Sequence, residues 1–129
     1  MKHLKNRPFR HRLMFALAGL REAWRRESSL RTHGMFAGFA FVALAILRPS
    51  AVWWAVVVVV VALVIALEML NAAIEAVIDL LHPNEHPEIK FAKDAVAGAV
   101  LTISIAALCV ALALVVDAAP MLIAWLRQL

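Results

Sequence analysis

The chain has 129 residues, of which 64% are hydrophobic, and it carries 13 Lys and Arg against 9 Asp and Glu. Soluble domains are about 45–50% apolar, and a domain this small buries only a modest fraction of its surface in a core. The composition therefore excludes an ordinary soluble fold. It predicts a protein that lies in a lipid bilayer, which can solvate the excess apolar surface.

The basic residues are concentrated near the N-terminus, where nine of the 13 fall within the first 31 residues. A sequence pI near 10.0 is also typical of nucleic-acid-binding proteins. Here the positive charges adjoin an apolar segment, where the positive-inside rule and anionic lipid headgroups explain them. We therefore expect no nucleic-acid partner. The single cysteine, Cys109, lies in an apolar run, which excludes an intrachain disulfide and a zinc or redox motif.

Residues 1–27 are predicted to form an amphipathic helix that lies in the membrane interface. Apolar side chains recur at helical spacing between arginines, at Leu13, Leu17, Leu20 and Trp24. Such a helix buries its apolar side at the boundary between headgroups and acyl chains. The alternative is that this segment is a positively charged anchor and nothing more.

The first membrane span is predicted at residues 28–47. The apolar run 35–47 has only 13 residues, fewer than the roughly 17–25 that a spanning helix needs. The preceding polar residues must therefore extend the helix, with Arg31 reaching toward the headgroups. A signal peptide is the alternative, but its basic stretch would be unusually long and no Ala-x-Ala cleavage pattern follows.

The second span is predicted at residues 51–80, after a tight turn. Pro49 interrupts the preceding helix and favours an extended conformation at Arg48. The run 51–67 is then uninterrupted by charge, and its helical pattern continues beyond it.

The third span is predicted at residues 91–118, after a polar, proline-bounded loop at 82–90. The run 95–116 is long enough to span a bilayer unaided. The chain is thus predicted to be an all-α protein with a single membrane domain, built from an interfacial helix and three transmembrane helices. The positive-inside rule places the N-terminus and the loop at 82–90 in the cytoplasm and the C-terminus outside.

Polar side chains line one stripe of the second span. Glu68 and Glu75 are two helical turns apart and, at about 100° per residue, about 20° from eclipsed. Asn71 and Asp79 flank the same stripe. A charge in a spanning helix costs about 2.5–3.5 kcal/mol at the bilayer centre, so it is a functional candidate by default. For Asp79 itself, the simpler interpretation is a solvated helix end.

Other charged residues are expected at the same cytoplasmic level: Glu27 before the first span, and Lys93 and Asp94 at the start of the third. Several oxygen ligands at the water boundary suit Mg²⁺, which binds carboxylates together with substrate phosphates. A metal, a positive charge and a base are the minimum for phosphoryl transfer. The sequence contains no GxxxxGK[ST] motif, which argues against a P-loop enzyme. Spacing alone does not distinguish a kinase from an ion carrier.

Three segments of the chain carry a family resemblance. The segments REAWRRE (21–27), EMLNAAIEAVID (68–79) and AKD (92–94) resemble the prokaryotic diacylglycerol kinases, a family that includes undecaprenol kinases. The resemblance implies a multi-pass enzyme of the bacterial inner membrane, a homotrimer with active sites between subunits, that uses ATP and Mg²⁺ to convert diacylglycerol to phosphatidic acid. Undecaprenol is the alternative acceptor.

A different class, a small oligomeric transporter of protons or cations, would use Glu68 as its carrier. Coupling sites of transporters lie near the bilayer midplane, whereas Glu68 is predicted to lie toward one end of its helix. The position of this carboxylate therefore favours the kinase.

The resemblance also implies residue roles. Glu68 would be the general base that activates the lipid hydroxyl, and Glu27 and Glu75 would hold the metal that bridges the phosphates. The ATP-binding residues would be Glu27, Glu75, Asn84, Glu85, His86, Lys93 and Asp94. The lipid path would be lined by Arg21, Trp24, Leu30, Arg31, Glu68 and Asn71.

The chain departs from the family pattern in three places. Tyrosine is common at the position of Phe15 and immediately before the position of His86, yet this chain has no tyrosine. The family has an acidic residue where this chain has His33. The departures fall on the expected nucleotide contacts and on the first span, and they leave the Glu68 and Glu75 pattern intact.

Overall fold

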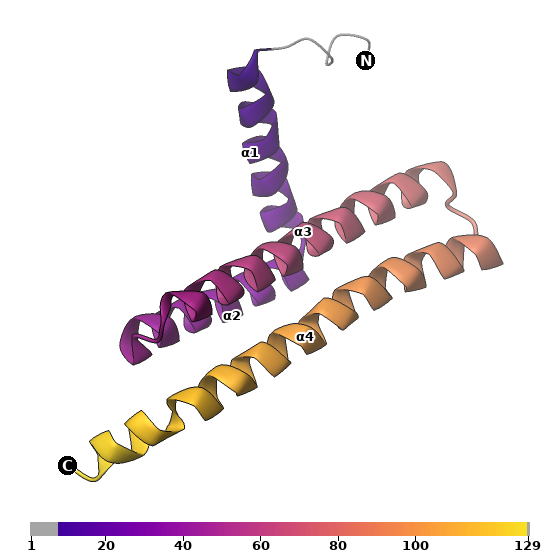
Figure 1. Ribbon diagram of the computed structural model, residues 1–129. Coiled ribbons are helices and arrows are strands. Elements are labelled where there is room, and N and C mark those ends of the chain that lie inside the picture. The colour runs from indigo at the N-terminus through magenta and orange to yellow at the C-terminus, as the bar shows by residue number, and fades with distance from the viewer. Residues whose placement is uncertain (1–7, 129) are drawn as a thin grey trace.

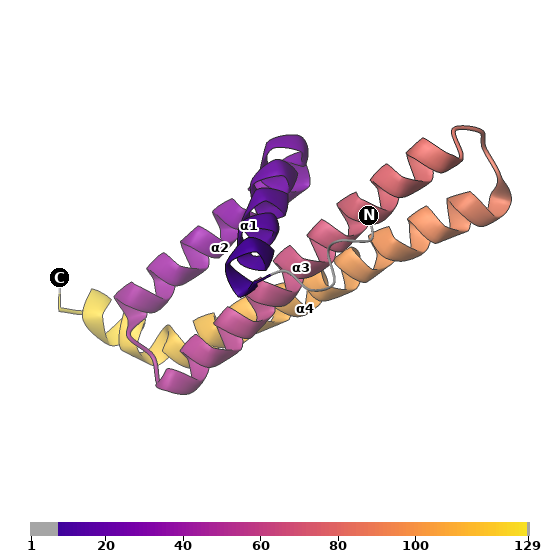
Figure 2. The same cartoon turned by 90° about the horizontal axis from the view of Figure 1, so that it is seen from above.

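The computed structural model describes residues 8–128, and these form four helices and no strand: α1 (Phe9–Arg26), α2 (Ser28–Leu47), α3 (Ala51–Leu81) and α4 (Pro87–Leu126). The long helices α2 and α4 run in one direction and α3 runs antiparallel to both, while α1 stands away from them at a steep angle (Figures 1 and 2). The predicted all-α architecture is confirmed. Residues 1–7 of the expected interfacial helix lie outside the described part of the chain.

Within the described residues, α2, α3 and α4 are each long and apolar enough to cross a membrane. The helix α2 begins at Ser28, so its polar first turn does extend the short apolar run into a helix of 20 residues. The break between α1 and α2 is a single residue, Glu27, whose backbone is extended. The described structure is that of a multi-pass membrane protein.

The turn between α2 and α3 differs from the expectation at Arg48. We expected an extended backbone, but Arg48 adopts the left-handed conformation, with φ 47° and ψ 50°. In this conformation its N–H donates to the Leu44 carbonyl at 2.9 Å and completes the last turn of α2. This bond satisfies a carbonyl that the helix end would otherwise leave unpaired. The prediction was wrong because it considered only the steric preference before Pro49.

The loop between α3 and α4 is also shorter than the predicted 82–90. It ends at His86, and residues 87–90 form the first turn of α4. Pro87 occupies the first helical position, where its fixed φ is favourable and its missing N–H has no helical partner to lose. The His86 Nδ1 accepts a hydrogen bond from the Glu88 N–H at 3.2 Å and caps the helix.

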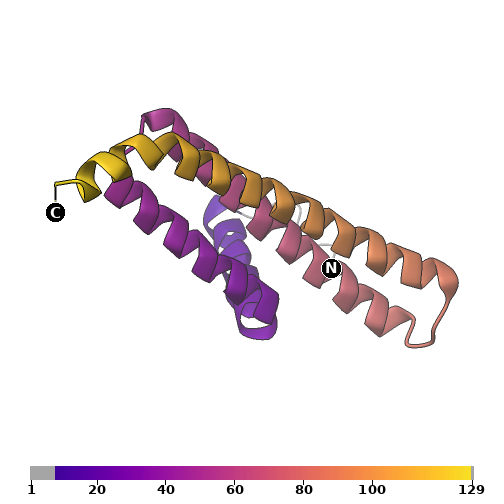
Figure 3. The same ribbon diagram turned by 90° about the horizontal axis from the view of Figure 1, so that it is seen from below.

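The hydrophobic core is small and joins the three long helices. Its buried residues are Leu44, Val57 and Leu114, one from each helix. Nearby, the Trp53 Nε1–H donates to Asp117 Oδ2 at 2.9 Å and ties α3 to α4. Figure 3 shows α4 running alongside α3. Most other large apolar side chains are exposed, as expected for helices that face lipid or other subunits.

The helix α1 is attached to the bundle at its C-terminal end. The Trp24 ring lies against Gly34 of α2, where an added Cβ would be only 2.5 Å from the ring. The Arg31 Nη1 donates to the carbonyls of Trp24 and Arg25 at 2.9 and 3.0 Å. A cation at a helix C-terminus pairs with carbonyls that have no helical partner. These contacts hold the end of α1 over the start of α2.

Candidate active site

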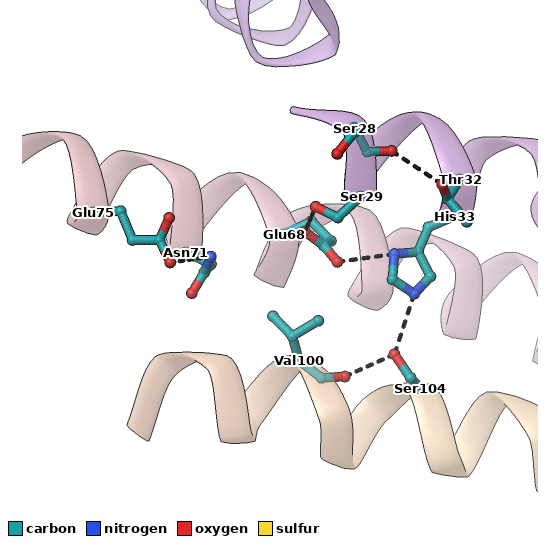
Figure 4. A network of polar contacts seen from close by, with 9 residues as sticks. All are labelled: Ser28, Ser29, Thr32, His33, Glu68, Asn71, Glu75, Val100 and Ser104. Carbon is teal, nitrogen blue, oxygen red and sulfur yellow. Dashed lines mark hydrogen bonds and ion pairs between the residues drawn. The ribbon is translucent and has the colours of Figure 1, made fainter. Parts of the chain in front are cut away.

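Among the described residues, Glu68 is the charged side chain that is buried, with an exposed fraction of 4%. It lies on α3 and faces the first turns of α2 (Figure 4). The Ser29 hydroxyl donates to Glu68 Oε2 at 2.7 Å, and His33 Nδ1 lies 2.8 Å from Oε1. A buried carboxylate is costly unless it is paired and hydrogen-bonded. Both oxygens of Glu68 therefore have a partner from α2.

His33 connects this carboxylate to the third long helix. Its Nε2 lies 3.3 Å from Ser104 Oγ on α4, and the Ser104 hydroxyl donates to the Val100 carbonyl at 2.8 Å. On the other side of the ring, Glu68 Oε1 is within ion-pair distance of Nδ1 but is not aligned with a ring N–H, so Nδ1 lacks a well-directed hydrogen bond. The contacts form a continuous path from α3 through α2 to α4.

Asn71 and Glu75 lie further along the same face of α3. The Asn71 Nδ2 donates to Glu75 Oε1 at 3.1 Å, while Asn71 Oδ1 is buried and has no hydrogen-bond partner. A buried acceptor without a donor costs free energy. The unpaired oxygen is therefore available to a hydroxyl or amide of a substrate that enters beside Glu68.

A pocket of about 650 Å³ lies where the α3–α4 hairpin turns. Five of its lining residues are those that the family resemblance assigned to the nucleotide: Asn84, Glu85, His86, Lys93 and Asp94. The structure thus brings this predicted group together. It adds Asp79, His82 and Lys90, which the sequence analysis did not assign to the nucleotide.

Both lysines of this pocket are paired with carboxylates. The Lys93 Nζ contacts Asp79 of α3 across the hairpin, and the Lys90 Nζ lies 2.8 Å from Asp94 one turn further along α4. The pairs are largely exposed, so they add little stability. Phosphate oxygens accept strong charge-assisted hydrogen bonds and can replace these carboxylates as partners of the lysines.

A second, apolar groove of about 440 Å³ lies between α1, α2 and α3. It contains three residues of the predicted lipid path, Arg21, Trp24 and Leu30. Arg31, also expected there, instead points to the last carbonyls of α1. The lining is almost wholly hydrophobic, and Ile65 places the groove within one helical turn of Glu68 on α3.

The donor set for a metal is incomplete within one chain. Among the described residues, no three His, Cys, Asp or Glu side chains are close enough together to hold a metal ion. Glu27 precedes α2 but does not cap it with its side chain, and Glu75 keeps one oxygen on Asn71. Mg²⁺ is usually bound by one or two carboxylates together with substrate phosphates. Glu27 and Glu75 are ligands of this chemical type.

Sequence reasoning missed Ser29 and Ser104 as site residues, and it noted His33 only as a departure from the family pattern. A signal was present, because Ser29 and His33 are four residues apart and so share one face of α2. Two polar side chains on one face of an apolar helix suggest a buried partner. Glu68 is that partner.

Comparisons with known proteins cover most of the chain. Residues 14–115 match the sequence profile of the family described as "Prokaryotic diacylglycerol kinase". A diacylglycerol kinase of Synechocystis sp. is 40% identical over 98 residues, which are 74% of this chain and 55% of that protein. An undecaprenol kinase of Bacillus subtilis is 32% identical over 67% of this chain and 71% of its own length. A diacylglycerol kinase of Escherichia coli K12 is 36% identical over the same shares.

Proposed function

The chain belongs to the prokaryotic diacylglycerol kinase family, and from this membership we propose that it is an ATP-dependent lipid kinase that phosphorylates diacylglycerol. The observation that carries the proposal is the buried carboxylate of Glu68, which lies within a helical turn of an apolar groove. The groove suits an acyl chain. A hydroxyl held at its polar end would meet a carboxylate that can take its proton.

In the proposed reaction, Glu68 takes the proton of the lipid hydroxyl while the hydroxyl oxygen bonds to the γ-phosphorus of ATP. The bond from that phosphorus to the bridging oxygen breaks, and ADP leaves. When bound, Mg²⁺ neutralises charge on the phosphates, and Glu27 and Glu75 are the residues that would hold it.

The hairpin pocket is the proposed nucleotide site. Lys93 would contact the phosphates, and the loop residues before α4 would contact the rest of the nucleotide. Along α3, Asp79 is eleven residues from Glu68, or about 16 Å at 1.5 Å per residue. A nucleotide whose γ-phosphate points from the pocket toward Glu75 would cover most of this length.

Neutralising either proposed metal ligand is expected to raise the magnesium requirement. Glu27→Gln and Glu75→Gln each remove one anionic oxygen ligand, so the Mg²⁺ concentration for half-maximal rate should rise by roughly tenfold or more. The measurement is a magnesium titration of phosphate transfer at saturating lipid. Glu88→Gln, which removes an exposed charge from the first turn of α4, is the matched control. Unaltered titrations in both variants would assign Glu27 and Glu75 to solvated helix ends.

The acceptor lipid needs its own test, because one of the relatives is named an undecaprenol kinase. We expect diacylglycerol to be the better substrate of this chain. The test measures transfer of the labelled γ-phosphate of ATP to diacylglycerol and to undecaprenol side by side in mixed micelles. A higher kcat/KM for undecaprenol would replace the proposed acceptor and keep the kinase. Transfer to neither lipid, by protein shown to be folded, would contradict the proposed function.

The same proposal places the protein in the bacterial inner membrane as a homotrimer. The start of α2 and the α3–α4 hairpin lie toward the same end of the bundle (Figure 1), and the excess of basic residues near α1 supports a cytoplasmic location for this end. The C-terminus would then lie outside. Small residues on α4, such as Ala97 and Gly98, permit close approach of a helix from a neighbouring subunit.

A further inference from the structure

The contacts of His33 connect Glu68 to the middle of α4, at Ser104, about ten residues beyond the proposed nucleotide contacts Lys93 and Asp94 on the same helix. We infer that His33 is a positioning residue for Glu68, with its ring orientation fixed by Ser104 of α4. This inference rests on the proposed lipid kinase function. It deepens that function, because it names the group that holds the base in place.

The directions of the two hydrogen bonds of Ser104 support the inference. A carbonyl can only accept, so the 2.8 Å contact between Ser104 Oγ and the Val100 carbonyl uses the single hydroxyl proton of Ser104. The contact between Ser104 Oγ and His33 Nε2, at 3.3 Å, must then use a proton on Nε2. The tautomer of His33 is therefore set by a residue on α4. A hydrogen bond to one ring nitrogen of a histidine commonly determines which of the two nitrogens carries the proton.

The opposite side of the ring faces the carboxylate. His33 Nδ1 and Glu68 Oε1 are 2.8 Å apart, so the ring lies against this oxygen and limits its movement. Ser29 donates to the other carboxylate oxygen. The ring and the hydroxyl together hold the carboxylate from both sides.

This arrangement gives His33 a defined part in the reaction. The proton leaves the lipid hydroxyl for the Glu68 carboxylate, the hydroxyl oxygen bonds to the γ-phosphorus, and ADP departs. The proton then rests on the Glu68 carboxyl group, and it leaves to water after the phosphorylated lipid has gone. The contacts of His33 are with Glu68 and Ser104, so its effect in this reaction is to orient Glu68.

Removing the ring should therefore lower kcat and leave nucleotide binding unchanged. We expect His33→Ala to lower kcat by roughly tenfold or more, because small displacements of a catalytic group have large effects on rate, with KM for ATP within twofold. His33→Asn places its amide nitrogen near the position of Nδ1 and should recover part of the loss. His33→Gln places its amide near Nε2 and should recover less. The inference would be overturned if the kcat of His33→Asn were no higher than that of His33→Gln. It would also be overturned if the kcat of His33→Ala were within twofold of wild type.

Ser104 has a matched control on the same helix. Thr102 also donates to the carbonyl four residues before it, at 2.8 Å, whereas only Ser104 of the two contacts His33. Ser104→Ala should lower kcat by roughly threefold or more, and Thr102→Ala should not. Equal rates in the two variants would remove α4 from the positioning path.

A spectroscopic measurement separates this inference from the proposed function. In ¹⁵N-histidine-labelled full-length protein, His33→Asn identifies the His33 ring resonances by difference. We expect a protonated Nε2 whose resonance shifts in Ser104→Ala and stays in place in Thr102→Ala. An unprotonated Nε2 would overturn the inference even in an active kinase. A wild type that transfers phosphate to no lipid would instead contradict the proposed function, whatever the resonances show.

Discussion

Replacing Glu68 by Gln is expected to lower turnover by at least about a hundredfold, the usual scale for loss of a general base. Glutamine keeps the shape of the side chain, and its amide oxygen can still accept from the Ser29 hydroxyl. It has no lone pair basic enough to take the proton of a lipid hydroxyl. The measurement is kcat at saturating ATP and diacylglycerol, and a value within threefold of wild type would exclude Glu68 as the base.

The same variant should fold at least as well as wild type. A charge inside a membrane helix is unfavourable, and the amide removes it while it keeps the contacts to α2. Thermal unfolding in detergent should give a midpoint no lower than that of wild type. Asp117→Asn is the matched control, because Asp117 is hydrogen-bonded by Trp53 elsewhere in the same bundle. That variant should keep its turnover. The result would show that the loss of turnover in Glu68→Gln comes from loss of the base and does not follow from removal of any carboxylate in the bundle.

The helices followed from the sequence because their signals are local. Three apolar runs separated by prolines and polar residues predict three spans, and these correspond to α2, α3 and α4. The errors lie at helix ends. The backbone of Arg48 depends on a capping hydrogen bond to Leu44, and the start of α4 depends on Pro87 together with the His86 cap. Such ends are decided by single hydrogen bonds that residue preferences do not determine.

The candidate site was predicted only in part, for a different reason. Periodicity along α3 shows that Glu68 and Glu75 share a face, but it does not show which face of α2 meets them. That depends on how α2 is rotated against α3, which the packing of many side chains sets. Ser29, His33 and Ser104 became visible as partners only once the three helices were placed. A buried carboxylate in an apolar helix still indicates that such partners exist.

Two inactive variants are expected to restore each other if neighbouring subunits share each site. Glu27 lies between α1 and α2, leaves its own helix uncapped, and belongs to no group of three metal-binding side chains in the described chain. Its carboxylate is therefore available to a site completed by a second subunit. Glu27→Gln and Glu68→Gln proteins are unfolded and refolded together in equal amounts. They are assayed at a Mg²⁺ concentration too low to support the Glu27→Gln protein, so that each variant alone is inactive. Random assembly of a closed trimer gives both wild-type residues to about a quarter of the sites, and activity should return to that level.

The competing arrangement has support in one contact, since Ser29, two residues after Glu27, reaches Glu68 within a single chain. If both carboxylates of a site came from one subunit, the mixture would stay inactive. Wild type refolded with an equal amount of the Glu27→Gln, Glu68→Gln double variant separates the two cases when subunit mixing is shown by co-purification of two differently tagged proteins. Shared sites leave about a quarter of the wild-type activity per site, whereas sites within one subunit leave about half, by the same random assembly of a cyclic trimer. If half of the wild-type activity remained and the mixture of the two single variants were inactive, each complete site would lie in one subunit.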